Sequence, residues 1–376
     1  MIKEIYSKLP AKILDPIKSI LRQVLLILLS IAITSILIWI MGYSPLAVFD
    51  GLSNGITKDF PGTLRWTTPL ILSGLAIAVA FKTGAWNLGV DGQLYMGALA
   101  ATAVSLGLST LPGVLLFPIT VLAGIIAGML WALLAGILRT QYGANDLVSS
   151  LLLTYVAYHF SDYLIHGPLK SGAYGPAESS NIIPETVWLP KIIEGSSVTI
   201  GLIVAIVLAV VLYFLIFRTT LGYELKVVGS NLWFSRYGGI KVKAVYLKGM
   251  AISGAISGLI GVIEILGVHH RFPIRFSSGL GFDGIVVSLL ASNNPLGVII
   301  SGLFFGALRN GSYNIERLTE IPRAMVIIVQ AIIVLMVGMQ VIIKFKKQKK
   351  DKQSSNDDQS KETEELNTFN TNGSEG

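Results

Sequence analysis

The stretch "GVLLFPITVLAGIIAGMLWALLAGIL", residues 113–138, decides the fold class, because it runs for 26 residues without one charged side chain. About 20 apolar residues are enough for a helix to cross a lipid bilayer. The apolar residues are continuous and do not alternate with polar ones, which favours a helix over a strand. Only helices and closed barrels satisfy their backbone groups in lipid. We therefore expect an all-α membrane protein.

The rest of the chain repeats this pattern. Of its 376 residues, 52% are hydrophobic and 14% are charged, which is typical of a membrane protein. Ten apolar runs are candidate spans, at about 20–42, 65–82, 89–108, 112–138, 147–166, 198–217, 249–268, 280–292, 295–308 and 322–343. The eighth and ninth are short and need not cross fully. The first is too long for a cleaved signal peptide. We predict a polytopic helix bundle of about ten transmembrane segments, some of them broken.

The basic residues predict the orientation. Ten crossings from a cytoplasmic N-terminus place the C-terminus in the cytoplasm, and 20 of the 29 Lys and Arg then lie on the inside. The net charge of +7 is thus explained by topology, and no single basic face suggests nucleic acid. We expect a basic cytoplasmic segment at 1–19, a transmembrane domain at 20–343 with a cytoplasmic loop at 218–248, and a disordered cytoplasmic tail at 344–376.

Signatures of covalent chemistry are missing from the sequence. It contains no phosphate-binding loop, nucleophile elbow, zinc-binding histidine pair or dinucleotide fingerprint. It contains no cysteine, which excludes disulfides and thiolate metal sites. Its four histidines, His159, His166, His269 and His270, are interpreted as polar residues at span ends in preference to a metal site. We expect transport or scaffolding, with no enzyme activity and no cofactor bound by this chain.

One predicted span is interrupted by polar residues and glycines. In "FKTGAWNLGVDGQLYMGALAA", residues 81–101, four glycines accompany Lys82, Asn87, Asp91 and Gln93. Irregular backbone at membrane depth is tolerated where it is packed in protein or lines a wet cavity. The stretch is therefore a candidate element of a substrate pathway.

A short echo of this stretch occurs 192 residues later. Gly89-Val90-Asp91-Gly92 is matched by Gly281-Phe282-Asp283-Gly284, and the predicted topology sends the two following helices in opposite directions. Paired broken helices in opposed halves build the central site of inverted-repeat transporters. A match of four residues also fits coincidence in a chain with 39 glycines. Further on, small residues four apart (Ser253, Ser257 and Gly261) predict close helix packing.

A basic insert, "TLGYELKVVGSNLWFSRYGGIKVK" (residues 220–243), separates two long apolar runs. Tyr223–Val228 can form a short helix that ends at Gly229, and Asn231 can cap a second one that Gly238-Gly239 ends. Apolar and aromatic surface is then expected at Leu225, Val228, Trp233, Phe234 and Tyr237. Such a surface fits a protein-docking patch, or a loop that rests on lipid headgroups.

Four motifs in order make the chain, from about 20 to 343, resemble a permease subunit of the ABC importers for ribose, branched-chain amino acids and nucleosides. They are "NLGVDGQLYMGALAA", "GANDLVSSLLLTYVAYHFSDYLIHGP", "GYELKVVGSNLWFSRYGGI" and "GFDGIVVSLLASNNPLGVIISGLFFGALRNGS". The resemblance implies that Gly222–Ile240 docks in a groove of an ATP-hydrolysing subunit. The implied coupling residues are Gly222, Tyr223, Glu224, Leu225, Val228, Gly229, Asn231, Phe234, Arg236, Tyr237 and Gly239.

The likeness is greatest to nucleoside permeases served by a lipoprotein of the basic-membrane-protein type. It implies a bacterial plasma membrane, a second permease subunit, a substrate-binding lipoprotein, and ATP and Mg on the partner ATPase. Candidate pathway residues for such a cargo are Asn87, Asp91, Gln93, Tyr155, Tyr158 and Glu264.

Several alternatives stay open at this point. The cargo could be ribose or another simple sugar, and an ion-coupled secondary carrier or channel is the alternative from another class. Glu264 could instead be hydrogen-bonded inside the bundle. The stretch "HHRFPIRF", residues 269–276, fits either contact with the binding protein or a segment that folds back into the membrane.

Overall fold

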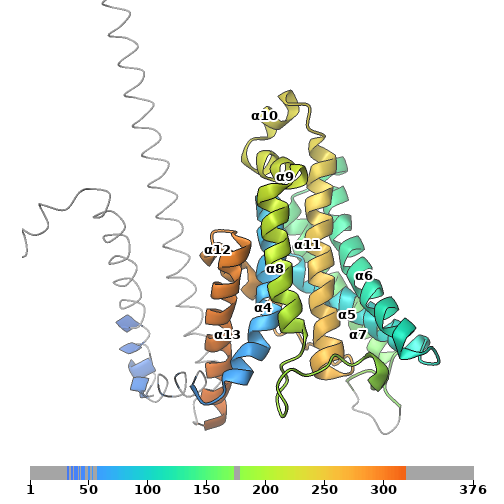
Figure 1. Ribbon diagram of the computed structural model, residues 1–376, viewed down its shortest axis with the longest axis vertical. Coiled ribbons are helices and arrows are strands. Elements are labelled where there is room, and N and C mark those ends of the chain that lie inside the picture. The colour runs from blue at the N-terminus through green and yellow to red at the C-terminus, as the bar shows by residue number, and fades with distance from the viewer. Residues whose placement is uncertain are drawn as a thin grey trace, which may run out of the picture. The chain divides into compact units, whose positions relative to one another are not determined.

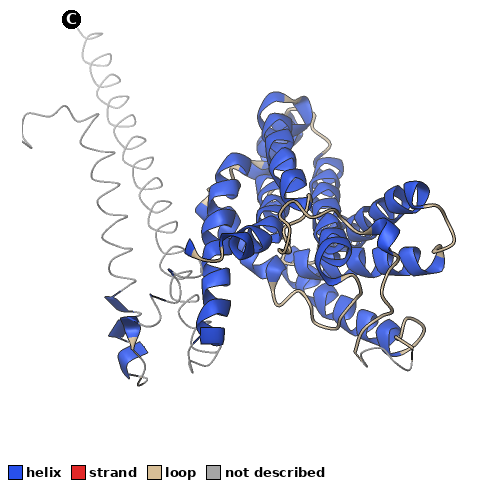
Figure 2. Cartoon of the chain, turned by 60° about the horizontal axis from the view of Figure 1, so that its bottom comes forward, coloured by secondary structure: helices blue, strands red, loops and turns tan. Residues whose placement is uncertain are grey.

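The computed structural model describes residues 57–172 and 178–318, with isolated residues between 32 and 53. Every element named below belongs to one compact unit, Tyr43–Ile327. The helices are α4 (Phe60–Lys82), α5 (Val90–Gly107), α6 (Gly113–Tyr142), α7 (Asp146–His166), η1 (Glu185–Val187), α8 (Gly201–Arg218), α9 (Thr220–Ser230), α10 (Leu232–Tyr237), α11 (Val242–Glu264), the π-helical η2 (Ile265–His269), α12 (Leu280–Leu290) and α13 (Pro295–Leu318). Figure 2 shows helices joined by loops and no strand in this part of the chain.

The helices divide into central and peripheral ones. In α4 and in α11 with η2, 78% and 72% of the most apolar 18-residue window is buried, against 28% in both α6 and α8. A helix that is apolar all round and still exposed suits lipid contact. These four are the described helices long and apolar enough to cross a membrane. The expected all-helical membrane bundle is thus confirmed for these residues.

Eight of the ten predicted spans fall on described residues, and each coincides with a helix from α4 to α13. With 11 residues, α12 is about 16 Å long, which is too short to cross a bilayer. The last of the eight continues past its predicted end at 308 to Leu318, since Arg309 and Asn310 bond to neighbouring segments inside the bundle. The predicted spans at 20–42 and 322–343, the N-terminal segment and the tail lie outside the residues described in continuous stretches.

Small residues let α6 and α11 approach closely. A Cβ atom added to Gly128 would lie 2.6 Å from the Cα of Gly258, and one added to Gly258 would lie 2.3 Å from the carbonyl oxygen of Gly124. Neither residue therefore tolerates a side chain unless the helices move. Gly254 meets Ala132 and the carbonyl oxygen of Gly128 in the same way. Gly261, which belongs to the predicted pattern, packs in the same way against the backbone of Leu94 and Ala98 in α5, so close packing is confirmed at this residue.

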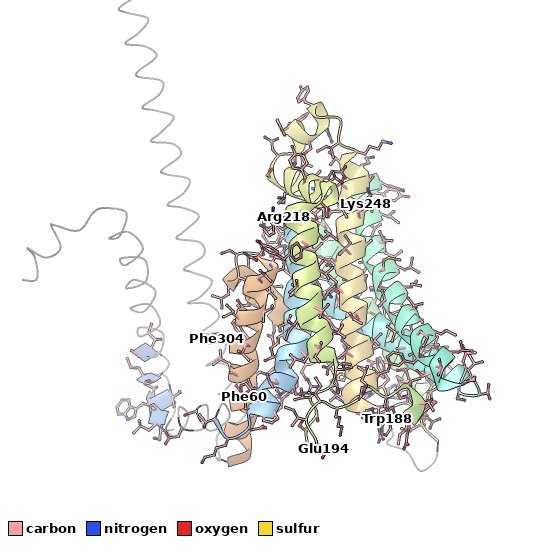
Figure 3. All side chains as sticks on the ribbon, viewed as in Figure 1. Phe60, Trp188, Glu194, Arg218, Lys248 and Phe304 are labelled. Carbon is pink, nitrogen blue, oxygen red and sulfur yellow. The ribbon has the colours of Figure 1, made fainter. Side chains whose placement is uncertain are left out.

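Two short helices, α9 and α10, cap one end of the bundle (Figure 1). We call residues 220–237 the handle. In Figure 3, Arg218 and Lys248 lie toward the handle, whereas Phe60, Trp188 and Glu194 lie toward the opposite end, which we call the distal end.

Candidate functional site

The handle consists of two capped helices in series. The Thr219 hydroxyl accepts a hydrogen bond from the Gly222 amide at 3.1 Å, and the Asn231 side chain accepts one from the Phe234 amide at 3.0 Å. Side-chain oxygens at these positions satisfy amides that a helix start leaves unpaired. The predicted pair of short helices is confirmed, with Asn231 as the cap of the second. The prediction that Gly229 ends the first was wrong, because α9 continues to Ser230.

The apolar face of α9 points into the bundle. Leu225 and Val228 are buried and pack against Val245 of α11. The expectation that these two residues form docking surface was therefore wrong, since α9 is amphipathic and its apolar side anchors it. The exposed aromatic residues lie on α10, where Trp233, Phe234 and Tyr237 are 69%, 61% and 90% exposed.

The handle also carries accessible polar and aromatic residues outside the apolar face of α9. Tyr223 is 56% exposed, and the Arg236 guanidinium lies 5.5 Å from the centre of the Trp233 ring. Glu224 is half-buried on α9, and Gly239 follows α10 with a positive φ of 75°. Exposed tryptophan, tyrosine and arginine side by side are the composition of a protein-binding hot spot.

The handle is wedged against the ends of other helices. Gly229 lies against the end of α4, where a Cβ would overlap the carbonyl oxygen of Lys82 and come within 2.9 Å of the Gly84 amide nitrogen. Gly222 lies equally close to the backbone of Leu215 and Ile216 in α8. A displacement of α9 therefore has to move α4, α8 or α11.

Deeper in the bundle, two of the predicted pathway amides bond to each other. Asn87 donates to Gln93 Oε1 at 3.0 Å and to Ser253 Oγ at 2.9 Å, and Gln93 donates back to Asn87 Oδ1 at 2.8 Å. Asn87 Oδ1 also accepts from the Gly89 amide at 3.0 Å. Both side chains are buried. In this arrangement they hold the loop before α5 in place and have few free polar atoms.

Asp91 joins the two glycine motifs of the sequence. Its buried carboxylate accepts hydrogen bonds from the Tyr158 hydroxyl and the Ser277 hydroxyl, and from the Gly281 amide at 2.8 Å. Asp91 lies in the first turn of α5 and Gly281 in the first turn of α12. The starts of the two broken helices therefore meet, and the carboxylate neutralises the partial positive charge at both.

Two ion pairs lie beside the Trp66 ring. Glu264 accepts two hydrogen bonds from Arg65, at 2.6 and 3.3 Å, and their side chains are 2% and 11% exposed. Arg309 bonds to Asp283, whose side chain is 45% exposed. The Arg65 and Arg309 guanidinium carbons lie 3.9 and 4.6 Å from the centre of the Trp66 ring. Glu264 is thus a buried, paired carboxylate.

The segment 269–276 folds back into the bundle. Phe272 is completely buried, and its ring centre lies 5.9 Å from that of Tyr95 in α5. The Phe272 amide donates to Ser180 Oγ at 2.9 Å, which joins the segment to the loop after α7. Of the two alternatives for this stretch, the structure supports folding back. Tyr155, in contrast, is 54% exposed, and its ring centre lies 6.2 Å from that of Tyr158.

Sequence reasoning missed Arg65 as a partner of Glu264. Its signal was present, because an ionisable residue within a predicted span needs a partner. The described residues contain no group of three His, Cys, Asp or Glu side chains that could hold a metal ion. What the arrangement offers is paired polar groups, aromatic rings and a rigid handle, which suit binding and movement.

Comparisons with known proteins show the family of this chain. Residues 61–363 match the family model described as the permease component of the branched-chain amino acid transport system. The guanosine ABC transporter permease protein of Bacillus subtilis (strain 168) is 35% identical, covering 87% of this chain and 95% of that protein.

Two further relatives name different cargoes. The glucose ABC transporter permease protein of Haloferax volcanii is also 35% identical, over 83% of this chain and 85% of its own length. The nucleoside ABC transporter permease protein of Lactococcus lactis subsp. cremoris is 30% identical, over 87% and 93%. No solved structure gives a significant match.

Proposed function

The chain belongs to the permease-component family of the branched-chain amino acid transport system and is a permease subunit of an ABC importer, and from this premise we propose that it carries nucleosides. The observation that carries the proposal is the 35% and 30% identity to guanosine and nucleoside permeases along almost their entire lengths. The glucose permease at 35% keeps a simple sugar as the second candidate.

The proposed assembly contains this chain, a second permease subunit, an ATPase that binds ATP and Mg, and a substrate-binding lipoprotein. It lies in a bacterial plasma membrane with the handle, both termini and the ATPase in the cytoplasm. The positive-inside bias supports this orientation. About ten spans are proposed for the full chain, and the four described helices of sufficient length and hydropathy are part of that number.

The handle is proposed to connect ATP hydrolysis to transport. Closure of the ATPase would push on the exposed aromatic face of α10. The buried anchors Leu225 and Val228 would pass the motion to α11. Gly229 and Gly222 would pass it to α4 and α8, whose ends they touch. A rigid insert that contacts several helices can bias a bundle between two states.

The meeting of the α5 and α12 starts supports an inverted repeat. Asp91 and Gly281 belong to the two glycine motifs of the sequence, and the hydrogen bond between them brings these motifs into contact. Transporters with inverted repeats place their substrate near such a junction of broken helices. The proposed nucleoside path runs beside this junction and past Tyr158.

Uptake into proteoliposomes tests the proposal. The complete importer should accumulate radiolabelled nucleoside only when ATP and the binding lipoprotein are supplied, and accumulation should persist when sodium and proton gradients are abolished. Glucose or ribose in excess should not compete. Uptake driven by an ion gradient with this chain alone, or uptake of sugar and not nucleoside, would contradict it.

A further inference from the structure

A π-helical turn at the distal end of α11 places one histidine among aromatic rings. The turn is η2, Ile265–His269, and such turns are frequent at functional sites. The His269 Nε2 atom is buried and has no hydrogen-bond partner among the described residues. Its nearest charged neighbour is the Glu264 carboxylate at 3.7 Å, and that carboxylate already accepts two hydrogen bonds from Arg65. A buried polar atom without a partner is costly, so it calls for an explanation.

The His269 ring packs against one aromatic ring, Phe276, which connects it to three more. The Phe276 ring centre lies 5.6 Å from that of His269 and 4.9 Å from that of Tyr95. The Tyr95 ring also meets Tyr158 at 4.6 Å and Phe272 at 5.9 Å. We call these five residues, His269, Tyr95, Tyr158, Phe272 and Phe276, the aromatic cluster.

We propose that the aromatic cluster holds the base of the transported nucleoside, with His269 Nε2 bonded to the edge of the base; this inference rests on the proposed function. Every nucleobase presents a flat face that stacks on aromatic side chains and an edge that donates and accepts hydrogen bonds. The cluster presents both features: several rings, and one buried nitrogen without a hydrogen-bond partner among the described residues.

A sugar fits the cluster less well than a base. Its several hydroxyl groups would each need a polar partner when they lose water. The nearby amides of Asn87 and Gln93 bond to each other, and the Asp91 carboxylate accepts three hydrogen bonds. The polar atom left over in the cluster is the one on His269.

The structure shows the cluster in a closed arrangement. Phe272 is completely buried and Phe276 is 9% exposed, so a base would have to enter between the rings of Phe276 and Tyr95 and push them apart. Two residues of this segment, His270 and Arg275, have φ values of 55° and 58°. Residues other than glycine rarely adopt this left-handed conformation, and such strain concentrates where segments switch. In the proposed site, this is the segment that would move to admit the base.

The test uses the complete importer in proteoliposomes and compares two adjacent histidines. His269→Phe keeps an aromatic ring and removes the polar atom of the cluster. His270→Phe is the matched control, because the His270 Nδ1 is also buried without a partner among the described residues but its ring stacks on Trp188, 3.9 Å away and outside the cluster. Two further variants, Tyr95→Leu and Tyr95→Phe, test stacking. The wild-type importer and all four variants are assayed for nucleoside uptake, for ATP hydrolysis and for labelling by a photoreactive azido-purine nucleoside.

The azido label should map to peptides that contain Tyr95 or 269–276. Loss of one hydrogen bond in a desolvated site should raise the KM for uptake roughly tenfold in His269→Phe. His270→Phe should stay within about twofold of the wild type, Tyr95→Phe should retain stacking and uptake, and Tyr95→Leu should lose both.

The inference is overturned if the two histidine variants have equal effects, or if the label is confined to other peptides while wild-type uptake is normal. Either outcome leaves the proposed function standing. Wild-type importer that carries sugar and no nucleoside would overturn both. Melting temperatures of all variants show whether a loss comes from misfolding.

Discussion

The buried pair between Arg65 and Glu264 gives the sharpest prediction about stability. The two side chains are 11% and 2% exposed, and they share two hydrogen bonds between α4 and α11, 199 residues apart in sequence. Glu264→Gln removes the negative charge and leaves the guanidinium buried. Breaking a buried pair from one side costs about 3–5 kcal/mol. At roughly 2 °C per kcal/mol, the melting temperature should fall by about 6–10 °C.

The Arg309–Asp283 pair provides the comparison. The Asp283 side chain is 45% exposed, so water screens its attraction to Arg309, and after Asp283→Asn the buried Arg309 guanidinium keeps its hydrogen bond to the Ser278 carbonyl oxygen at 3.1 Å. The expected cost is about 1 kcal/mol or less, which corresponds to roughly 2 °C. Thermal unfolding of the purified protein in detergent, followed by intrinsic fluorescence, measures both variants.

A double variant separates the charge from the packing. Replacing both partners with methionine, Arg65→Met with Glu264→Met, leaves no uncompensated buried charge and should recover at least half of the loss seen in Glu264→Gln. The reasoning is refuted if Glu264→Gln and Asp283→Asn lower the melting temperature equally. It is also refuted if the double variant is less stable than Glu264→Gln.

Three further variants test the junction and the handle. Asp91→Asn removes the charged acceptor of three hydrogen bonds, so unfolding should become easier by about 1–3 kcal/mol in a denaturant titration; an unchanged midpoint would contradict the role of the carboxylate. Asn231→Ala removes the cap of α10 at a cost of about 1 kcal/mol, so amide exchange at 232–237 should accelerate roughly fivefold with the global melting temperature unchanged. Gly229→Ala forces α9 away from Lys82, at a strain of about 1–3 kcal/mol, and should lower uptake more than ATP hydrolysis. Gly238→Ala is the control and should preserve both activities, because the nearest atom to its new Cβ is 3.4 Å away.

Local patterns predicted much of this architecture. Apolar runs located the described helices because a helix in lipid must satisfy its backbone internally and expose apolar side chains. The handle was predicted because Asn231 and the paired glycines at 238 and 239 are short-range signals of helix start and end. The small residues of α11 predicted close packing for the same reason, since their spacing alone defines one helix face.

Contacts between distant segments could not be predicted in this way. The partner of Glu264 is 199 residues away, and the Asp91 carboxylate meets the Gly281 amide across 190 residues. The same limit explains the error at Leu225 and Val228, whose burial depends on Val245 in the next long helix. An amphipathic helix has an apolar face in either case, and tertiary packing decides whether that face is a docking surface or an anchor.

Site-specific photo-cross-linking tests the central claim most directly. A photoreactive amino acid replaces either Phe234, which is 61% exposed on α10, or Leu225, which is buried on α9, in the complete importer. If the handle is a mechanical joint, position 234 should capture the ATPase subunit, and the yield should change when the ATPase is held in its ATP-bound state. Position 225 should capture only this chain. Capture of lipid and no ATPase from position 234 would contradict it.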